Sequence, residues 1–138
     1  MKIMNFALLA GVAGLLASCG GSSIVEPADL NNQRVFFAFN SAEISDEAHD
    51  NLLGQSLYMK HHEGTKIQIA GNCDERGSTE YNLALGARRA NAAKAVLVED
   101  GVEASRISTI SYGKERPLVK GTGEEVWQYN RNATTTVK

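Results

Sequence analysis

Residues 71–90 read Gly71-Asn-Cys-Asp-Glu-Arg-Gly-Ser-Thr-Glu-Tyr-Asn-Leu-Ala-Leu-Gly-Ala-Arg-Arg-Ala90 and combine a polar segment with the start of a helical pattern. The first seven residues of this stretch are mostly polar with a glycine at each end, which predicts a loop between two regular elements. Ser78 or Thr79 then offers an N-cap for a long helix that stops at Gly101. At about 100° per residue, one face of this helix forms an apolar stripe that we expect in the core: Leu83, Ala87, Ala90, Ala93 and Leu97.

The two adjacent arginines of this helix point in different directions. Asn82 and Arg89 are seven residues apart and project within about 20° of each other, roughly 90° from the apolar stripe. Arg88 points almost directly away from the stripe, into solvent. We therefore expect Arg89 on a flank that is open to a site, with a solvated surface charge as its alternative role.

The sequence before this stretch predicts a strand, a helix and a second strand. Residues 35–39 and 66–70 alternate as strands do. Between them, Ser45 followed by two acidic residues predicts the start of a helix, which ends near Gly64. One face of this helix carries a second set of residues expected in the core: Ala48, Leu52, Ser56 and Met59.

The sequence after the long helix predicts a third strand over residues 106–112 and a turn at Gly113 and Pro117. A short helix over 124–129 and a closing strand over 133–137 complete the chain. This order of elements predicts a two-layer α/β (α+β) sandwich, with helices on one face of the sheet.

The amino terminus has the pattern of an export signal. Lys2 is followed by an apolar or small run over residues 6–17. A membrane span needs about 20 apolar residues, so this run is short for one. We expect a secretory signal, with an uncleaved anchor helix as the alternative.

The run ends in Leu16-Ala17-Ser18-Cys19, which resembles a bacterial lipobox. The resemblance implies cleavage before Cys19 and a covalent lipid on that residue, as S-diacylglycerol and an N-acyl chain, with no other cofactor. Two or three acyl chains anchor a protein stably to a membrane. A disulfide between Cys19 and Cys73 is the alternative and would exclude the lipid. The expected organisation is a signal peptide over 1–18, the lipidated cysteine and a flexible linker over 19–33, and a folded domain over 34–138.

Length and charge limit the number of domains and exclude one class of partner. The 138 residues suffice for one domain, and 14 basic residues stand against 16 acidic ones. The net charge is therefore −2, and removal of the segment that contains Lys2 makes it −3. A clustered basic excess is absent, so we expect no nucleic-acid partner.

The quoted stretch closely resembles the signature of the OmpA-like peptidoglycan-binding domain family. Further matches lie at Val35-Phe-Phe-Ala-Phe39, at Ser111-Tyr-Gly-Lys-Glu-Arg-Pro117 and at Asn130-Arg131, in family order and spacing. The resemblance implies a βαβαβ-type fold with helices on one face of a mixed sheet. It also implies noncovalent binding to the stem peptide of cell-wall peptidoglycan.

In that family, two residues hold diaminopimelate, and they match Asp74 and Arg89 here. Diaminopimelate ends in an amino group and a carboxylate on one carbon, so an anion beside a cation suits it. The resemblance carries over eight further binding residues: Asn40, Ser41, Asn72, Arg76, Tyr81, Asn82, Leu85 and Arg131. Packing is the alternative role for Tyr81 and Leu85, and shaping of the loop is the alternative for Asn72.

Two positions depart from the family pattern. Asn40 stands where an Asp is usual, and Asn132 stands where a second Arg is common. The resemblance implies an outer-membrane lipoprotein whose domain lies in the periplasm and tethers the membrane to the wall. Its implied partners are the stem peptide and the Tol proteins of the envelope, TolB first and TolA second. A Tol-binding lipoprotein with weak or lost peptidoglycan binding is the alternative, and the two departures favour it.

An enzyme is the alternative class of function. His49, His61 and His62 have no metal-ligand spacing, and Cys73 has no organised base beside it. Asp74 and Glu75 are adjacent loop residues, and such carboxylates rarely face one cleft as a glycosidase pair does. We therefore predict no catalytic residue, no metal site and no enzymatic activity.

Overall fold

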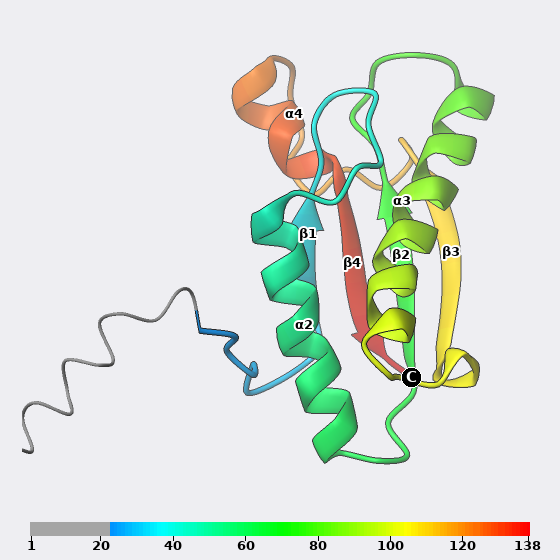
Figure 1. The fold of residues 1–138 in the computed structure, drawn as a ribbon. Coiled ribbons are helices and arrows are strands. Elements are labelled where there is room, and N and C mark those ends of the chain that lie inside the picture. Colours follow the sequence, from blue (N-terminus) through cyan, green and yellow to red (C-terminus); the bar gives the residue numbers. More distant parts are fainter. Residues whose placement is uncertain (1–22) are drawn as a thin grey trace, which may run out of the picture.

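The computed structural model describes residues 23–138, which form one four-stranded sheet with its helices on one side (Figure 1). The strand order in the sheet is β1-β4-β2-β3. The strands are β1 (Gln33–Phe36), β2 (Ile67–Asn72), β3 (Ile107–Gly113) and β4 (Asn132–Val137). The helices are α2 (Asp46–His61), α3 (Thr79–Glu99) and α4 (Glu124–Asn130), with a 3-10 turn over Ala104–Arg106.

The sheet is mixed, as the family resemblance implied. β4 lies between β1 and β2 and is antiparallel to both, while β2 and β3 are parallel and joined through α3. Because β1 and β2 run in the same direction, the loops that follow them leave from the same edge of the sheet (Figure 1). The predicted α/β sandwich is therefore confirmed, and its topology brings two distant loops together.

Local capping signals place the two long helices where the sequence predicted them. The side chain of Ser45 accepts a hydrogen bond from the backbone N–H of Ala48 at 3.1 Å, at the start of α2. Ser78 accepts one from Tyr81 at 3.0 Å, at the start of α3. Ser78 rather than Thr79 is thus the N-cap of α3.

The two strands that lead to the shared edge end at other residues than predicted. β1 stops at Phe36 instead of reaching residue 39, because the chain leaves the ladder and turns at Asn40, whose φ is 57°. β2 continues past residue 70 through Gly71 and Asn72, which pair with Ala133 and Asn132 of β4. Gly71, which was predicted to begin the loop, is therefore a strand residue.

The core lies between the sheet and the pair α2 and α3. The four residues predicted for the buried face of α2 are all buried. In α3, Ala90, Ala93 and Leu97 are buried as predicted. The prediction that Leu83 is buried is wrong, because 41% of its surface is exposed. The buried face of α3 is instead rotated toward Asn82, Leu85, Gly86 and Arg89, because the loops at the sheet edge cover its first half.

Residues ahead of β1 also belong to the folded unit. Leu30, placed by the sequence in a flexible linker, is fully buried in the hydrophobic core. Farther out, Glu26 lies 2.7 Å from His61 at the end of α2. The predicted signal peptide over 1–18 and Cys19 lie outside the described residues. Within the described part, no helix has the length and apolar character needed to cross a membrane.

Candidate functional site

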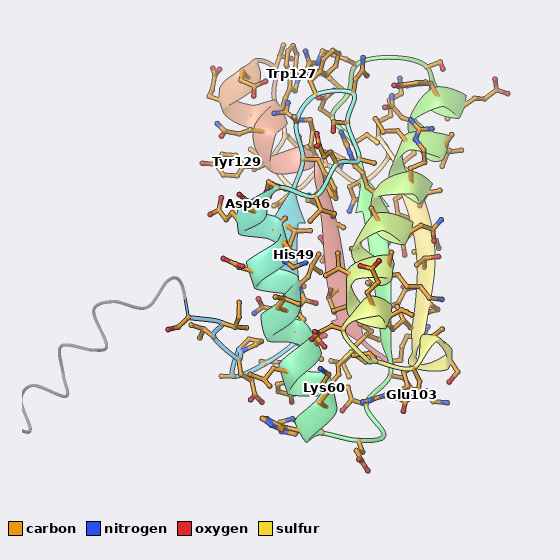
Figure 2. The ribbon with its side chains drawn as sticks, in the orientation of Figure 1. Asp46, His49, Lys60, Glu103, Trp127 and Tyr129 are labelled. Atoms are coloured by element: carbon orange, nitrogen blue, oxygen red, sulfur yellow. The ribbon has the colours of Figure 1, made fainter. Side chains whose placement is uncertain are left out.

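The sheet edge where β1 and β2 end carries most of the predicted site residues. Residues 37–41 follow β1, residues 73–78 follow β2, and the first turns of α3 lie against both loops. α4 lies at the same end of the molecule, where Figure 2 labels its Trp127. Three parts of the chain that are far apart in sequence thus meet here: the loop after β1, the loop after β2 with the start of α3, and α4.

Arg89 is buried at this edge, not on an open flank as predicted. Only 1% of its surface is exposed. Its guanidinium donates to the backbone carbonyls of Ala38, Ser41 and Asn72 at 2.8–3.0 Å, and so joins the loop after β1 to the end of β2. Burial lowers the pKa of Arg89. A guanidinium has five N–H donors, so these three carbonyls leave two N–H groups for other acceptors.

Asp74 is the second buried charge, with 4% of its surface exposed. Arg76 donates to both of its carboxylate oxygens, at 3.2 Å from Nε and 2.8 Å from Nη2, and its backbone N–H adds a bond of 3.0 Å. Arg131 approaches the same carboxylate at 3.4 Å. Burial alone raises the pKa of Asp74, but the bonds from Arg76 and Arg131 outweigh it and the pKa is lowered.

The side chain of Arg76 covers the carboxylate of Asp74. Its guanidinium carbon lies 3.8 Å from the ring centre of Phe39 and 3.9 Å from that of Trp127. Two cation–π contacts of this kind hold the guanidinium over the carboxylate. Glu75 supports the arrangement, since its carboxylate accepts a bond of 2.8 Å from the indole N–H of Trp127.

A small pocket joins Asp74 and Arg89. Its free volume is about 10 Å³, roughly the space of one water molecule. Its walls contain the buried anion, the buried cation and the arginine that covers the anion. The lining residues are Phe39, Asn40, Cys73, Asp74, Arg76, Asn82, Leu85 and Arg89.

Most of the other predicted site residues contribute to the frame of this pocket. The side chain of Asn82 donates to the carbonyls of Arg76 and Ser78 at 2.8 and 3.0 Å, and so fixes the loop. Ser41 contributes its carbonyl to Arg89. The hydroxyl of Tyr81 donates to Oδ1 of Asn40 at 3.1 Å. Leu85 is 3% exposed and packs at the pocket wall.

The side chain of Asn72 lies away from the pocket, which Ser41, Tyr81 and Arg131 also do not line. The carbonyl of Asn72 accepts from Arg89, whereas its side chain lies on the opposite face of the sheet. There Nδ2 donates to Oδ1 of Asn132 at 2.9 Å. Asn132 is itself buried and donates to the carbonyl of Tyr129 at 2.9 Å. This departure from the family pattern therefore forms a buried amide pair between β2 and β4.

Arg131 braces the pocket from behind. Its Nε donates to the carbonyl of Phe37 at 2.8 Å, and its two terminal nitrogens bond to Glu124 at 3.1 and 2.7 Å. The hydrogen bond to Glu124 is the main cause of a raised pKa for Arg131. Glu124 and Trp127 were not predicted as site residues, because both reach the site through the packing of α4, which no local sequence pattern reports.

His61, His62 and Cys73, the candidates for an enzymatic site, each contact a different group. His61 pairs with Glu26, and His62 stacks on Tyr58 with ring centres 3.9 Å apart. Burial raises the pKa of Cys73, whose thiol is directed to the carbonyl of Asn82 at 3.3 Å. Across residues 23–138, no three histidine, cysteine, aspartate or glutamate side chains gather as metal ligands would.

Comparison with known proteins identifies the family. The profile of the OmpA family matches residues 36–131. The peptidoglycan-associated lipoprotein of Mesorhizobium japonicum is 41% identical over 99% of this chain and 80% of its own length. That of Pasteurella multocida is 38% identical over 96% of each chain. The crystal structure of the peptidoglycan-associated lipoprotein from Burkholderia pseudomallei superposes with a TM-score of 0.75 at 39% identity, over 77% of this chain and 90% of that one.

These matches agree with the fold described above, and the relatives carry the names of lipoproteins rather than of enzymes. The family profile covers α2, β2, α3, β3 and α4, and with them Asp74 and Arg89. The chain belongs to the OmpA family.

Proposed function

We propose that this protein is an outer-membrane lipoprotein that binds the diaminopimelate-containing stem peptide of peptidoglycan and so tethers the membrane to the cell wall. The observation that carries the proposal is the pocket itself. Asp74 from the loop after β2 and Arg89 from α3 are both buried, yet both line one pocket. Burial of two charges is costly, and a site that must hold a zwitterion gives a reason for it.

The chemistry of the pocket matches the amino-acid end of diaminopimelate. The ammonium group of the ligand replaces the guanidinium of Arg76 on the carboxylate of Asp74. The adjacent carboxylate accepts the two N–H groups of Arg89 that the three carbonyls leave over. Lysine has no carboxylate at that carbon, so it satisfies only half of the site.

The size of the pocket requires Arg76 to move when the ligand binds. A free volume of about 10 Å³, roughly that of one water molecule, does not admit an ammonium group and a carboxylate together. Arg76 is 31% exposed at its side chain, and only its contacts with Asp74, Phe39 and Trp127 keep it in place. Rotation of this one side chain toward solvent uncovers the carboxylate.

The attachment to the membrane and the Tol partners complete the proposal. Lipid on Cys19 holds the chain at the outer membrane, and the domain reaches the wall from the periplasmic side. TolB is the main partner that the family resemblance implies, and TolA is a second candidate. The names of the relatives support peptidoglycan association and a lipid anchor in general terms.

The test uses the full chain in neutral detergent micelles, titrated with muropeptides that carry either diaminopimelate or lysine. We expect binding to the diaminopimelate form alone. Asp74→Asn and Arg89→Lys each lower the affinity at least tenfold, since one loses the anion and the other the planar fork. Arg88→Lys, on the solvent side of the same helix turn, is the matched control and leaves the affinity unchanged.

Circular dichroism of each variant shows whether the fold is retained. Equal affinity for the two muropeptides would contradict recognition of diaminopimelate. A folded protein that binds neither muropeptide would overturn the proposal in favour of a Tol-binding lipoprotein, for which Asn40 and the closed pocket would then be the reasons.

A further inference from the structure

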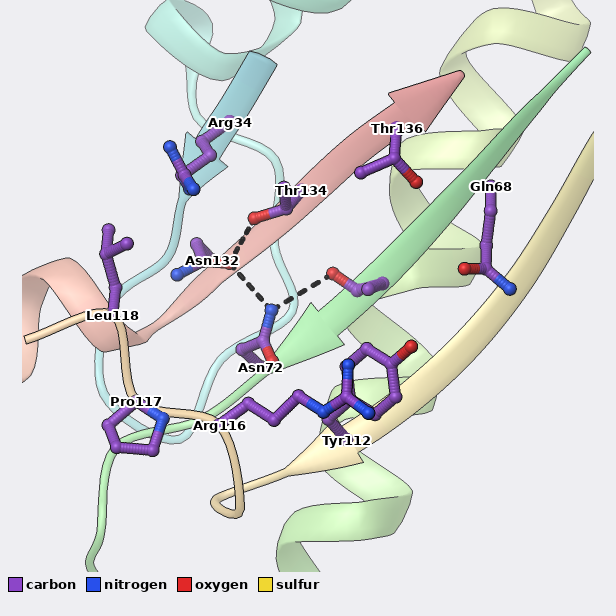
Figure 3. A pocket seen from close by; sticks show the side chains of 11 residues that line it. Arg34, Gln68, Asn72, Tyr112, Arg116, Pro117, Leu118, Asn132, Thr134 and Thr136 are labelled. Atoms are coloured by element: carbon purple, nitrogen blue, oxygen red, sulfur yellow. Dashed lines mark hydrogen bonds between the residues drawn. The ribbon is translucent and has the colours of Figure 1, made fainter. Parts of the chain in front are cut away.

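The face of the sheet that the helices leave uncovered contains a groove of about 290 Å³ (Figure 3). All four strands contribute to it, together with the loop that follows β3. Because side chains alternate along a strand, these residues point away from α2 and α3 and from the core. Its volume is close to the lower limit for pockets that hold small ligands, about 300 Å³.

The charged side chains that line the groove are all basic. Arg34 of β1 stands at one side, and Arg116 of the loop after β3 stands at the other, where it stacks on the ring of Tyr112 at 3.7 Å. No acidic side chain lines the groove. Among residues 23–138, neither guanidinium has a carboxylate partner. Two unpaired arginines thus share one concave surface in a protein of net charge −2.

The floor of the groove is polar and partly unsatisfied. Gln68 and Thr136 face each other across β2 and β4, and their side chains make no hydrogen bonds within the described residues. Asn72 is 8% exposed, and its Oδ1 has no partner in that same part of the chain. The floor therefore offers donors and acceptors for an amide-bearing ligand.

We propose that this groove binds an extended acidic segment of a partner protein, with a carboxylate at each arginine and backbone amides over the polar floor. The spacing of the arginines favours two separated anionic groups. Arg34 and Tyr112 lie on the two outer strands, three strand spacings apart and offset by two residues along β3, which is about 16 Å at the backbone and about five residues of an extended peptide. A single phosphate or carboxylate is too small to reach both arginines.

The groove differs from the diaminopimelate pocket in chemistry and position. It has no acidic side chain to receive an ammonium group, so the zwitterionic end of diaminopimelate does not suit it. The diaminopimelate pocket lies among the loops and α3, whereas the groove lies on the bare face of the sheet. A partner in the groove therefore leaves access to Asp74 and Arg89 open.

The test measures binding of the full chain in neutral detergent to a fluorescent acetyl-tetraglutamate amide. The matched tetraglutamine peptide and inorganic phosphate are the comparison ligands. We expect the acidic peptide to bind and the neutral one not to, with affinity falling as salt rises. Arg34→Gln and Arg116→Gln each weaken binding about threefold, and the double variant about tenfold.

Two controls separate the groove from general attraction to positive charge. Arg88→Gln removes an exposed arginine from α3, on the helical side of the sheet, and leaves the peptide affinity unchanged. A saturating concentration of the diaminopimelate muropeptide also leaves it unchanged, which distinguishes this site from peptidoglycan binding. Amide chemical-shift changes on titration should gather at Gln68, Thr134 and Thr136.

The proposal fails if both peptides bind equally, or if Arg88→Gln weakens binding as much as the groove variants do. It also fails if the double variant retains wild-type affinity for the acidic peptide. Inorganic phosphate that displaces the peptide completely at equal concentration would indicate a simple anion site on one arginine and would overturn the two-point arrangement.

Discussion

Arg76 and Asp74 show how a single residue pair sets the state of a binding pocket. The carboxylate of Asp74 accepts three bonds from Arg76 and a longer one from Arg131. An incoming ammonium group therefore competes with an internal cation that is already in place. The observed affinity for a ligand is lowered by the fraction of molecules in which Arg76 covers the carboxylate.

Replacement of Arg76 by glutamine should tighten binding of the diaminopimelate muropeptide by about three- to tenfold. The change removes the competing cation while Arg131 still pairs with Asp74. Calorimetric titration of the variant beside the wild type measures the effect, with Arg88→Gln as the control. Weaker binding by the Arg76 variant would mean that Arg76 itself holds the ligand.

The lowered pKa of Asp74 has a consequence for stability at acidic pH. A carboxyl group whose folded pKa lies below its unfolded value, about 3.9, stabilises the fold above that value and loses the contribution as pH falls through the folded pKa. The difference in unfolding free energy between wild type and Asp74→Asn should therefore be large at pH 7 and shrink below about pH 4. Urea denaturation at a series of pH values measures it. A difference that stays constant down to pH 2 would contradict this account.

The residue scale is also where reasoning from sequence reached its limit. Helix geometry placed Arg89 about 90° from the apolar stripe, yet the residue is fully buried. The carbonyls that accept its bonds come from residues 38, 41 and 72, and no periodicity within α3 reports on them. Asp74 and Arg89 were paired through the family resemblance, and the structure now places both at one pocket.

At the scale of elements, what could be predicted depended on how local the cause was. The N-caps at Ser45 and Ser78 act on the adjacent turn, and both helices begin after them. The ends of β1 and β2 depend on pairing with β4, which follows more than 50 residues later, and both were predicted incorrectly. A strand end is set by the partner strand as much as by its own residues.

Contact between β2 and α3 is unusually close and predicts a strong effect of one methyl group. A Cβ on Gly71 would overlap the carbonyl oxygen of Gly86. Gly71→Ala should therefore lower the free energy of unfolding by about 3 kcal/mol, near the upper end of overpacking effects. Gly86→Ala is the matched comparison and should lose less: its nearest contact is the movable hydroxyl of Ser111, the backbone oxygen of Gly71 lies farther away at 2.9 Å, and alanine favours a helix. Chemical denaturation measures both, and a Gly71 variant as stable as wild type would contradict the close packing.

At the scale of the whole molecule, the folded unit begins earlier than composition indicated. The segment ahead of β1 is polar and contains proline, which is typical of a linker. One leucine within it nevertheless fills the core beside α2 and the sheet. A single buried side chain is too weak a signal to be seen against such a background in the sequence.

Truncation of that leucine tests where the folded unit starts. Leu30→Ala should cost about 2–5 kcal/mol of unfolding free energy, because the residue is fully buried. Val25→Ala is the matched control in the same segment; its side chain is 75% exposed, and the change should cost less than about 0.5 kcal/mol. Equal effects in denaturant titrations would show that the segment is not part of the cooperative unit.

The position of β1 determines how the domain responds to tension. The chain enters the sheet at Gln33, at the edge opposite the loops that form the pocket (Figure 1). In the proposed function the chain is held ahead of Gln33 and at the pocket, so a pull between these two points acts along the strands. Hydrogen bonds in an antiparallel ladder lie perpendicular to the strands, so the bonds from Gln33–Thr135 to Phe36–Asn132 are sheared together rather than opened one by one. β4 passes the tension on to β2, and with it to the loop that carries Asp74.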